Sequence, residues 1–214
     1  MATVNLWKNV AVAMQSAITA GTSISSLTKA NPGVATTGSA HGWSTGDYVL
    51  LSTQGMYQVN NRVVRLSGAS GSTFNLEGID TTNFDTFTSG TAYKITFGTT
   101  ISTATSMSAS GGTFDFIDTT TIHVNQKSQV PGLPNPVTYS FDNLWDPGDA
   151  GQIAMKTASD GSAQRAFKFT FSSGAVVVFS GYVGFSGSPT GSAQDKVVSP
   201  AVITQFGTLT NYSS

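Results

Sequence analysis

Short strand-like segments dominate this sequence and leave little room for helices. They run for four to eight residues, are rich in Val, Ile, Phe, Tyr and Thr, and are separated by clusters of Gly, Ser, Asn and Asp. In the clearest segment, near the C-terminus, phenylalanines alternate with polar residues, so one face of the strand is apolar. A turn at Gly174 leads to the partner strand at 176–182. These patterns predict an all-β chain with a core hairpin that comprises Phe167, Phe169, Phe171, Gly174, Phe179 and Tyr182.

Only one segment has helical spacing. Asp149 stands where an N-cap is expected, apolar residues recur at helical intervals through 150–160, and Gly161 follows them. We expect one helix of about three turns there. Farther on, 197–206 is typical of a strand in which Pro200 requires a sheet edge or a bulge. The residues from Thr208 onward are expected to form a polar tail.

Residues 31–97 have the pattern of a separate module. Five strand-like pieces alternate with turns in it, at 34–37, 48–52, 62–67, 73–76 and 92–96. Five short strands in a stretch of this length indicate a small β-barrel. Because we expect the strands on either side to belong to another sheet, we interpret 31–97 as an inserted domain. Residues 1–30 and 98–214 then form one discontinuous core domain, a β-sandwich or barrel.

The stretch between Phe114 and about residue 136 is the least regular part of the chain. A strand begins at Phe114 and places Asp115 and Asp118 on its polar positions. A long segment with several prolines and little apolar content follows, and it cannot pack inside a domain of this size. We expect it to project as a long loop and to contact another molecule. The residues expected to make this contact are Thr119, Thr121, His123, Asn125, Lys127, Pro131, Leu133 and Pro134.

Charged residues are sparse. The 214 residues include ten Lys and Arg, eleven Asp and Glu, no Cys, and 58 Ser and Thr. The lack of cysteine excludes disulfides and thiolate metal sites, and the lack of a basic excess argues against tight nucleic-acid binding. A surface poor in Lys and Glu resembles subunit interfaces, which predicts association with identical copies. The apolar run at 10–14 is too short for a signal peptide or a membrane span, so we expect a protein made in the cytoplasm.

No motif indicates catalysis or metal binding. His41 and His123 belong to no metal-ligand spacing, and no G-x-S-x-G motif marks a nucleophilic serine. Asp142, Asp146 and Asp149 lie close in sequence but lack the ligand order of a calcium loop. We therefore expect no catalytic residue, cofactor or metal, and no enzyme. The aromatic residues leave open an alternative, a carbohydrate- or cell-surface-binding β-module of a phage fibre or adhesin.

The C-terminal third resembles the major tail tube proteins of long-tailed bacteriophages. Trp145 and Pro147 match the family's approach to a short helix, and the segment 113–136 is similar to its strand and long loop before that helix. The residues that match its hairpin are Arg165, Phe167, Phe169, Phe171, Gly174, Phe179, Gly181, Tyr182 and Val183. The resemblance covers about residues 1–30 and 98–207, and the module is similar to small β-barrel repeats of phage structural proteins.

This resemblance implies a structural virion protein of the phage tail. Its β-sandwich core with one flanking helix would form six-membered rings that stack through the long loop into a hollow tube. Such a tube encloses the tape-measure protein, meets tail tip and terminator proteins, and conducts DNA into the host without sequence-specific binding and without a membrane partner. Assembly takes place in the host bacterial cytoplasm. Asp115 and Asp118 are the candidate lumen charges, and the inserted module is expected on the tube exterior.

Overall fold

The computed structural model describes residues 7–213; the outermost residues of the expected core domain, 1–6 and 214, lie outside this range. The strands are β1 (Ala11–Ile18), β2 (Thr22–Leu27), β3 (Val34–Thr37), β4 (Tyr48–Gln54), β5 (Val63–Ser70), β6 (Thr73–Leu76), β7 (Ser89–Thr100), β8 (Ala104–Ser110), β9 (Phe114–Asp118), β10 (Gln129–Pro134), β11 (Thr138–Leu144), β12 (Gln164–Thr170), β13 (Val176–Phe185) and β14 (Val198–Tyr212). Within these residues, a 3-10 turn (Tyr57–Val59) and the helix α1 (Ala150–Asp160) complete the fold. The expectation of an all-β fold with one short helix is confirmed.

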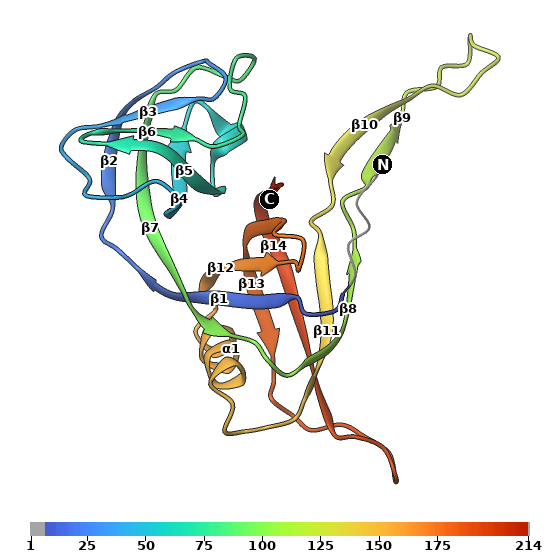
Figure 1. The fold of residues 1–214 in the computed structure, drawn as a ribbon. Helices are drawn as coiled ribbons and strands as arrows, with labels where there is room; N and C mark the ends of the chain where they lie inside the picture. The colour runs from blue at the N-terminus through green and yellow to red at the C-terminus, as the bar shows by residue number, and fades with distance from the viewer. Residues whose placement is uncertain (1–6, 214) are drawn as a thin grey trace.

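Twelve strands form one sheet in the order β2-β3-β6-β5-β4-β7-β1-β12-β13-β14-β11-β8, and β9 pairs with β10 separately. The long strand β7 links two bodies, because its first half lies in a barrel and its second half pairs with β1. Figure 1 shows the barrel at the upper left, with β7 running from it to the second body at the lower right, and the helix beneath β1.

The first six strands of this order close into a small barrel, because β2 pairs with β7 as well as with β3. Its interior is filled by side chains at alternate positions, for example Val49 and Leu51 on β4 and Phe74 and Leu76 on β6. All five strands expected between 31 and 97 are present. The sixth, β2, precedes residue 31. The division of the chain into two domains stays a prediction.

The second body has its own apolar core on one face of the sheet. Phe167 and Phe169 on β12 and Phe179 on β13 are at most 2% exposed. The rings of Phe167 and Phe179 stack with their centroids 5.6 Å apart. Met155 of α1 belongs to the same cluster, so the helix covers this face.

The helix begins and ends where its sequence predicts. The Asp149 side chain accepts a hydrogen bond from the Gln152 backbone N–H at 2.9 Å, as an N-cap does. The Gly161 N–H donates to the Thr157 carbonyl at the other end. The buried amide of Gln152 also donates to the Leu144 carbonyl at 2.6 Å, which fixes the helix against the end of β11.

The barrel packs on the opposite face of the same sheet. Val63 and Ile95 of the barrel form a third apolar cluster with side chains that include Val178 on β13. Thr210 on β14 joins the two bodies: its hydroxyl accepts from Arg62 Nε at 2.8 Å and donates to the Val63 carbonyl at 2.9 Å. The part of β12 to β14 around Phe169, Val178 and Thr210 is therefore covered on both faces.

The prediction of a polar tail from Thr208 onward was wrong. Strand β14 continues to Tyr212, and Tyr212 pairs with Val176 across the sheet. The Tyr212 hydroxyl accepts a hydrogen bond from the Arg65 backbone N–H at 2.6 Å. The polar sequence of this segment forms a strand because it pairs with β13 and contacts the barrel, and both are distant in the chain.

Pro200 does not lie on an edge strand, since β14 runs between β13 and β11. The ladder with β13 ends at Ala201, however. The Val198 N–H donates to the Thr190 carbonyl on the β13 side of β14. Because backbone directions alternate along a strand, the nitrogen of Pro200 also points to the β13 side. A proline is tolerated there because β13 ends before the position at which it would accept a hydrogen bond from the backbone N–H of residue 200.

Candidate functional site

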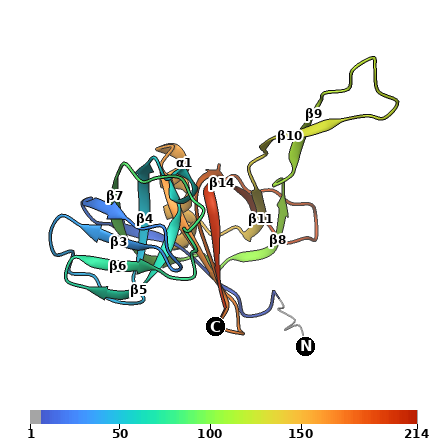
Figure 2. The same ribbon diagram turned by 90° about the horizontal axis from the view of Figure 1, so that it is seen from above.

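A two-stranded arm projects beyond the rest of the molecule (Figures 1 and 2). Its strands β9 and β10 pair antiparallel, with Asp118 opposite Gln129 and Ile117 opposite Val130. The predicted long loop is thus a hairpin. Of the residues predicted to contact another molecule, Thr119, Thr121, His123, Asn125 and Lys127 lie in its connection, and Pro131, Leu133 and Pro134 lie on β10.

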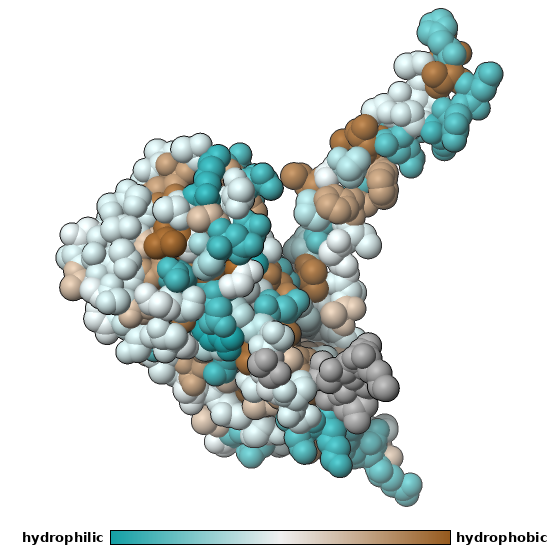
Figure 3. Space-filling view, turned by 45° about the horizontal axis from the view of Figure 1, so that its top comes forward, coloured by the Kyte–Doolittle hydropathy of each residue, from teal (hydrophilic) through white to brown (hydrophobic). Residues whose placement is uncertain are grey.

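The arm exposes large apolar side chains that nothing among residues 7–213 covers. Ile122 is 95% exposed and Leu133 is 87% exposed. The other exposed large apolar residues of the arm are Phe114, Phe116, Ile117, Val124 and Val130. Figure 3 shows these residues as brown groups recurring along the arm. A group of this size on an isolated hairpin indicates a contact surface for another molecule.

Hydrogen bonds within the arm hold its tip in shape. The Thr119 N–H donates to the Ser128 carbonyl at 2.9 Å, and the Ser128 N–H donates to Thr120 Oγ1 at 3.1 Å. The Asp118 carboxylate accepts from the Thr120 N–H at 2.8 Å. Hydrogen bonds from Thr120 to the charged form lower the pKa of Asp118, so this carboxylate stays ionised.

Both candidate lumen charges lie on this arm. The Asn135 amide donates to Asp115 Oδ1 at 3.1 Å, while Asp118 ends β9. Among residues 7–213, β9 pairs with β10 and with no strand of the main sheet. The sequence shows an alternating strand but not its partner. The lumen role of Asp115 and Asp118 stays a prediction.

Two glycines set the direction of the arm at its base. Gly111 and Gly112 have φ angles of +95° and +75°, which disfavour other residues. A Cβ at Gly111 would also lie 2.3 Å from the Pro136 carbonyl oxygen. Backbone hydrogen bonds nonetheless bridge the gap between the two sheets, since the Asn135 N–H donates to the Thr113 carbonyl at 2.9 Å. The arm is a continuation of β8 and β11 that is turned at these glycines.

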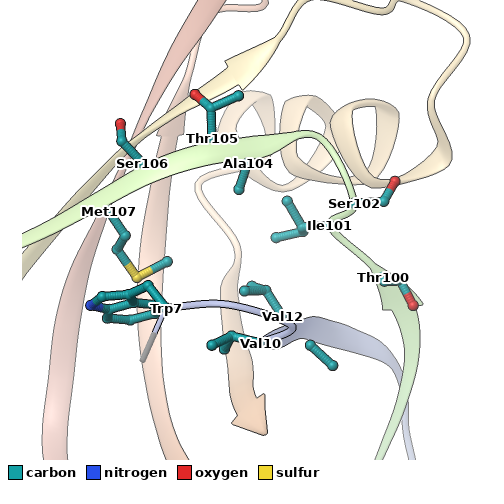
Figure 4. Close-up of a pocket in the computed structure, with 11 residues that line it drawn as sticks. Trp7, Val10, Val12, Thr100, Ile101, Ser102, Ala104, Thr105, Ser106 and Met107 are labelled. Atoms are coloured by element: carbon teal, nitrogen blue, oxygen red, sulfur yellow. The ribbon is translucent and has the colours of Figure 1, made fainter. Parts of the chain in front are cut away.

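Strand β8 leaves one edge of the main sheet open. Within residues 7–213 its only strand neighbour is β11. An apolar groove of about 290 Å³ runs beside this edge, lined in part by Trp7, Val12, Ile101 and Met107. Figure 4 shows the Trp7 ring next to the Met107 side chain. An open edge with an adjoining apolar groove is suited to pairing with another strand.

The predicted hairpin residues lie on β12, on β13 and in the turn between them. Phe167 faces Phe179 across the pair, and the turn contains Gly174 with φ +88°. Phe171 packs against the core cluster from the end of β12. Tyr182 belongs to the hairpin but not to the core, because 42% of it is exposed.

The remaining candidate residues have structural contacts. His41 Nδ1 accepts from the Trp43 N–H at 3.0 Å, and its ring stacks on that of Trp43. Among residues 7–213, no three His, Asp or Glu side chains gather where a metal ion could bind. Trp43, one of the aromatic residues on which the carbohydrate-binding alternative depends, is buried in the barrel.

Sequence reasoning missed the open edge of β8 and a second groove beside α1. The segment Ala104–Ser110 reads ATSMSAS and has few of the residues that mark strands. It pairs because β11 lies beside it, which the order of residues does not show. The groove beside α1 had one signal, the apolar Ile153 on the helix face opposite the buried Met155.

Comparison with known proteins identifies the family of this chain. No helix among residues 7–213 is long and apolar enough to cross a bilayer. A search of curated proteins found no match. The profile of the family described as phage tail tube protein matches residues 54–214, which include β8, the arm, α1 and the hairpin. The predicted resemblance to tail tube proteins is confirmed, and this chain belongs to the phage tail tube protein family.

Proposed function

We propose that six copies of this protein form a ring, and that rings stack through the arm into the hollow tube of the phage tail. The family is structural, and its members build a tube from identical subunits. The observation that carries the proposal is the arm, which projects with its large apolar side chains uncovered. An exposed apolar surface of this kind marks a site of protein–protein interaction.

Contacts within a ring involve the open edge of β8. Along this edge β8 has no strand neighbour among residues 7–213, and the groove lined by Trp7 and Met107 offers apolar area beside it. A neighbouring copy that adds a strand there satisfies the backbone groups and fills the groove. Closing a ring removes every such edge.

The tube encloses the tape-measure protein and then conducts DNA, without a catalytic role for the subunit. Ten basic against eleven acidic residues give a wall with no excess of groups that bind phosphate. Asp115 and Asp118 are the candidates for acidic groups on the lumen. The module of residues 31–97 lies outside the tube. Tail tip and terminator proteins meet the two ends, and assembly takes place in the host cytoplasm.

Deleting the arm tests this function. The backbones of Thr113 and Asn135 are already hydrogen-bonded, so an Asn-Gly turn in place of residues 114–134 closes the hairpin without strain. Every residue of β9 is exposed, and we therefore expect an unchanged unfolding midpoint.

Negative-stain microscopy at rising protein concentration then separates the alternatives. We expect hollow tubes from the wild-type chain and only single rings or monomers from the armless chain. A wild-type protein that stays monomeric or trimeric and binds glycans would show that the fibre or adhesin interpretation is right. Tubes of normal length from the armless chain would show that the arm has another role.

A further inference from the structure

A second apolar groove lies beside the helix, at the end of the molecule opposite the arm (Figure 1). It measures about 280 Å³ and lies between the N-terminal half of α1, the segment that precedes the helix and the end of β13. Its apolar lining consists of Trp145, Pro147, Ile153 and Phe185. A water molecule occupies roughly 30 Å³, so the groove has room for one or two large apolar side chains.

The groove is formed in advance rather than created by a partner. The Trp145 indole donates to the Gly187 carbonyl at 3.1 Å, and its backbone N–H donates to the Val197 carbonyl at 3.0 Å. Phe185 forms a buried floor, whereas Ile153 is 52% exposed at the rim. Side chains held in this way lose little conformational freedom when a partner binds.

The arm has the complementary properties. It presents uncovered Phe, Ile, Val and Leu side chains on a narrow hairpin, which matches an apolar groove of small volume. The one charged residue that lines the groove, Lys156, is already paired with Asp160 on the same helix. The match between these two ends of one chain is therefore one of apolar surfaces.

We propose that the arm of one copy docks in the Trp145–Ile153–Phe185 groove of a copy in the next ring. Two different surfaces at opposite ends of a chain make a head-to-tail contact, which repeats without closing and so extends an array along one axis. This proposal rests on the proposed tube and identifies the receptor for its arm. The contact is small, but it is repeated by every subunit of a ring, so its effect on stacking is multiplied.

Engineered cysteines test the contact directly, because the natural chain has none. Leu133→Cys on the arm is combined with Ile153→Cys at the rim of the groove. Two further pairs combine Ile153→Cys with Ile122→Cys or with Phe116→Cys, so that different registers of the arm are sampled. A disulfide forms only when the two Cα atoms come within about 7 Å. Oxidised tubes are then dissolved in detergent and examined on a non-reducing gel.

We expect at least one pair to give a ladder of covalent multimers, because each subunit links to the next along the axis. The control pair, Leu133→Cys with Ser39→Cys on the barrel, should give no ladder. Tubes that form with all three pairs but give no ladder would overturn the docking site and leave the tube itself intact. A wild-type chain that forms no tubes would instead contradict the proposed function.

A charge in the groove gives a second, independent test. Ile153→Lys keeps a helix-forming residue but puts an ammonium group where the arm would bind. We expect a folded protein whose critical concentration for tube assembly rises at least tenfold. The matched control is Ile18→Lys, a half-exposed isoleucine on β1 that lies outside the groove. Equal critical concentrations for the two variants would refute the proposal.

Discussion

Tyr212 should fasten the barrel to the sheet of the second body, although it lies two residues from the C-terminus. Its ring is 6% exposed and lies in the cluster that joins the two bodies. Its hydroxyl accepts from the Arg65 N–H at 2.6 Å, and the Arg65 guanidinium carbon lies 4.4 Å from the ring centroid. Both the ring and the hydroxyl should therefore contribute to stability.

Two substitutions separate these contributions. Tyr212→Phe removes only the hydroxyl and leaves the Arg65 N–H without its acceptor, which costs about 1–3 kcal/mol in the free energy of unfolding. Tyr212→Ala also removes the ring from a packed cluster, and we expect a total loss of about 3–5 kcal/mol. Asn211→Ala is the matched control, because this neighbour on β14 is exposed and should change the free energy by less than about 0.5 kcal/mol.

The assay is urea unfolding of monomeric protein, together with hydrogen exchange of the Arg65 amide. We expect stability to decrease in the order wild type, Tyr212→Phe, Tyr212→Ala, and exchange at Arg65 to become faster in both variants. If all three variants unfold at the same urea concentration as the wild type, the end of β14 does not contribute to stability and the two bodies are joined elsewhere.

Three further perturbations follow from contacts in the structure. Burial raises the pKa of Tyr212 to about 12, so the folded protein keeps the phenol proton, whereas unfolded chains lose it from about pH 10. Roughly 2–3 kcal/mol of stability, fully present below pH 10, should therefore be lost by pH 12. Alkaline melts in which Tyr212→Phe loses as much stability as the wild type would contradict this. Gly111→Ala places a Cβ 2.3 Å from the Pro136 carbonyl oxygen, so tube yield measured by microscopy should fall while circular dichroism of the subunit stays the same. Asp149→Ala removes the acceptor for the Gln152 N–H and should lower the unfolding free energy by about 1 kcal/mol, whereas Asp149→Asn should retain most of it.

Local patterns account for the elements that were predicted well. The alternation of Phe167 and Phe169 with polar residues specifies a strand with one buried face, and the Asp149 cap with Gly161 delimits a helix. Both signals depend on neighbours within a few residues, so no distant contact is needed to interpret them. Five of the six strands of the barrel were predicted for the same reason.

The projecting arm, the groove beside the helix and the open strand edge were predicted only in part. Prolines and sparse apolar residues indicated that 119–136 projects, and the structure shows that part of it is β10, paired with β9. Leu133 and Ile122 are apolar but exposed. Whether such a residue is exposed depends on which parts of the fold pack against it, and a sequence does not reveal this. The groove lined by Trp145 and Phe185 combines residues forty positions apart, and β8 gives almost no local signal.

The sequence by itself determined the class of fold, the place of the helix, the core hairpin and the projecting segment, because each depends on periodicity and capping within short windows. Only the tertiary structure decided that Thr210 and Tyr212 join the barrel to the sheet, that β9 pairs with β10 outside the main sheet, and that β8 is an open edge. These features depend on which strands become neighbours. Pairing is set by contacts between residues far apart in the chain, and the same polar segment can be a tail or a strand according to what lies beside it.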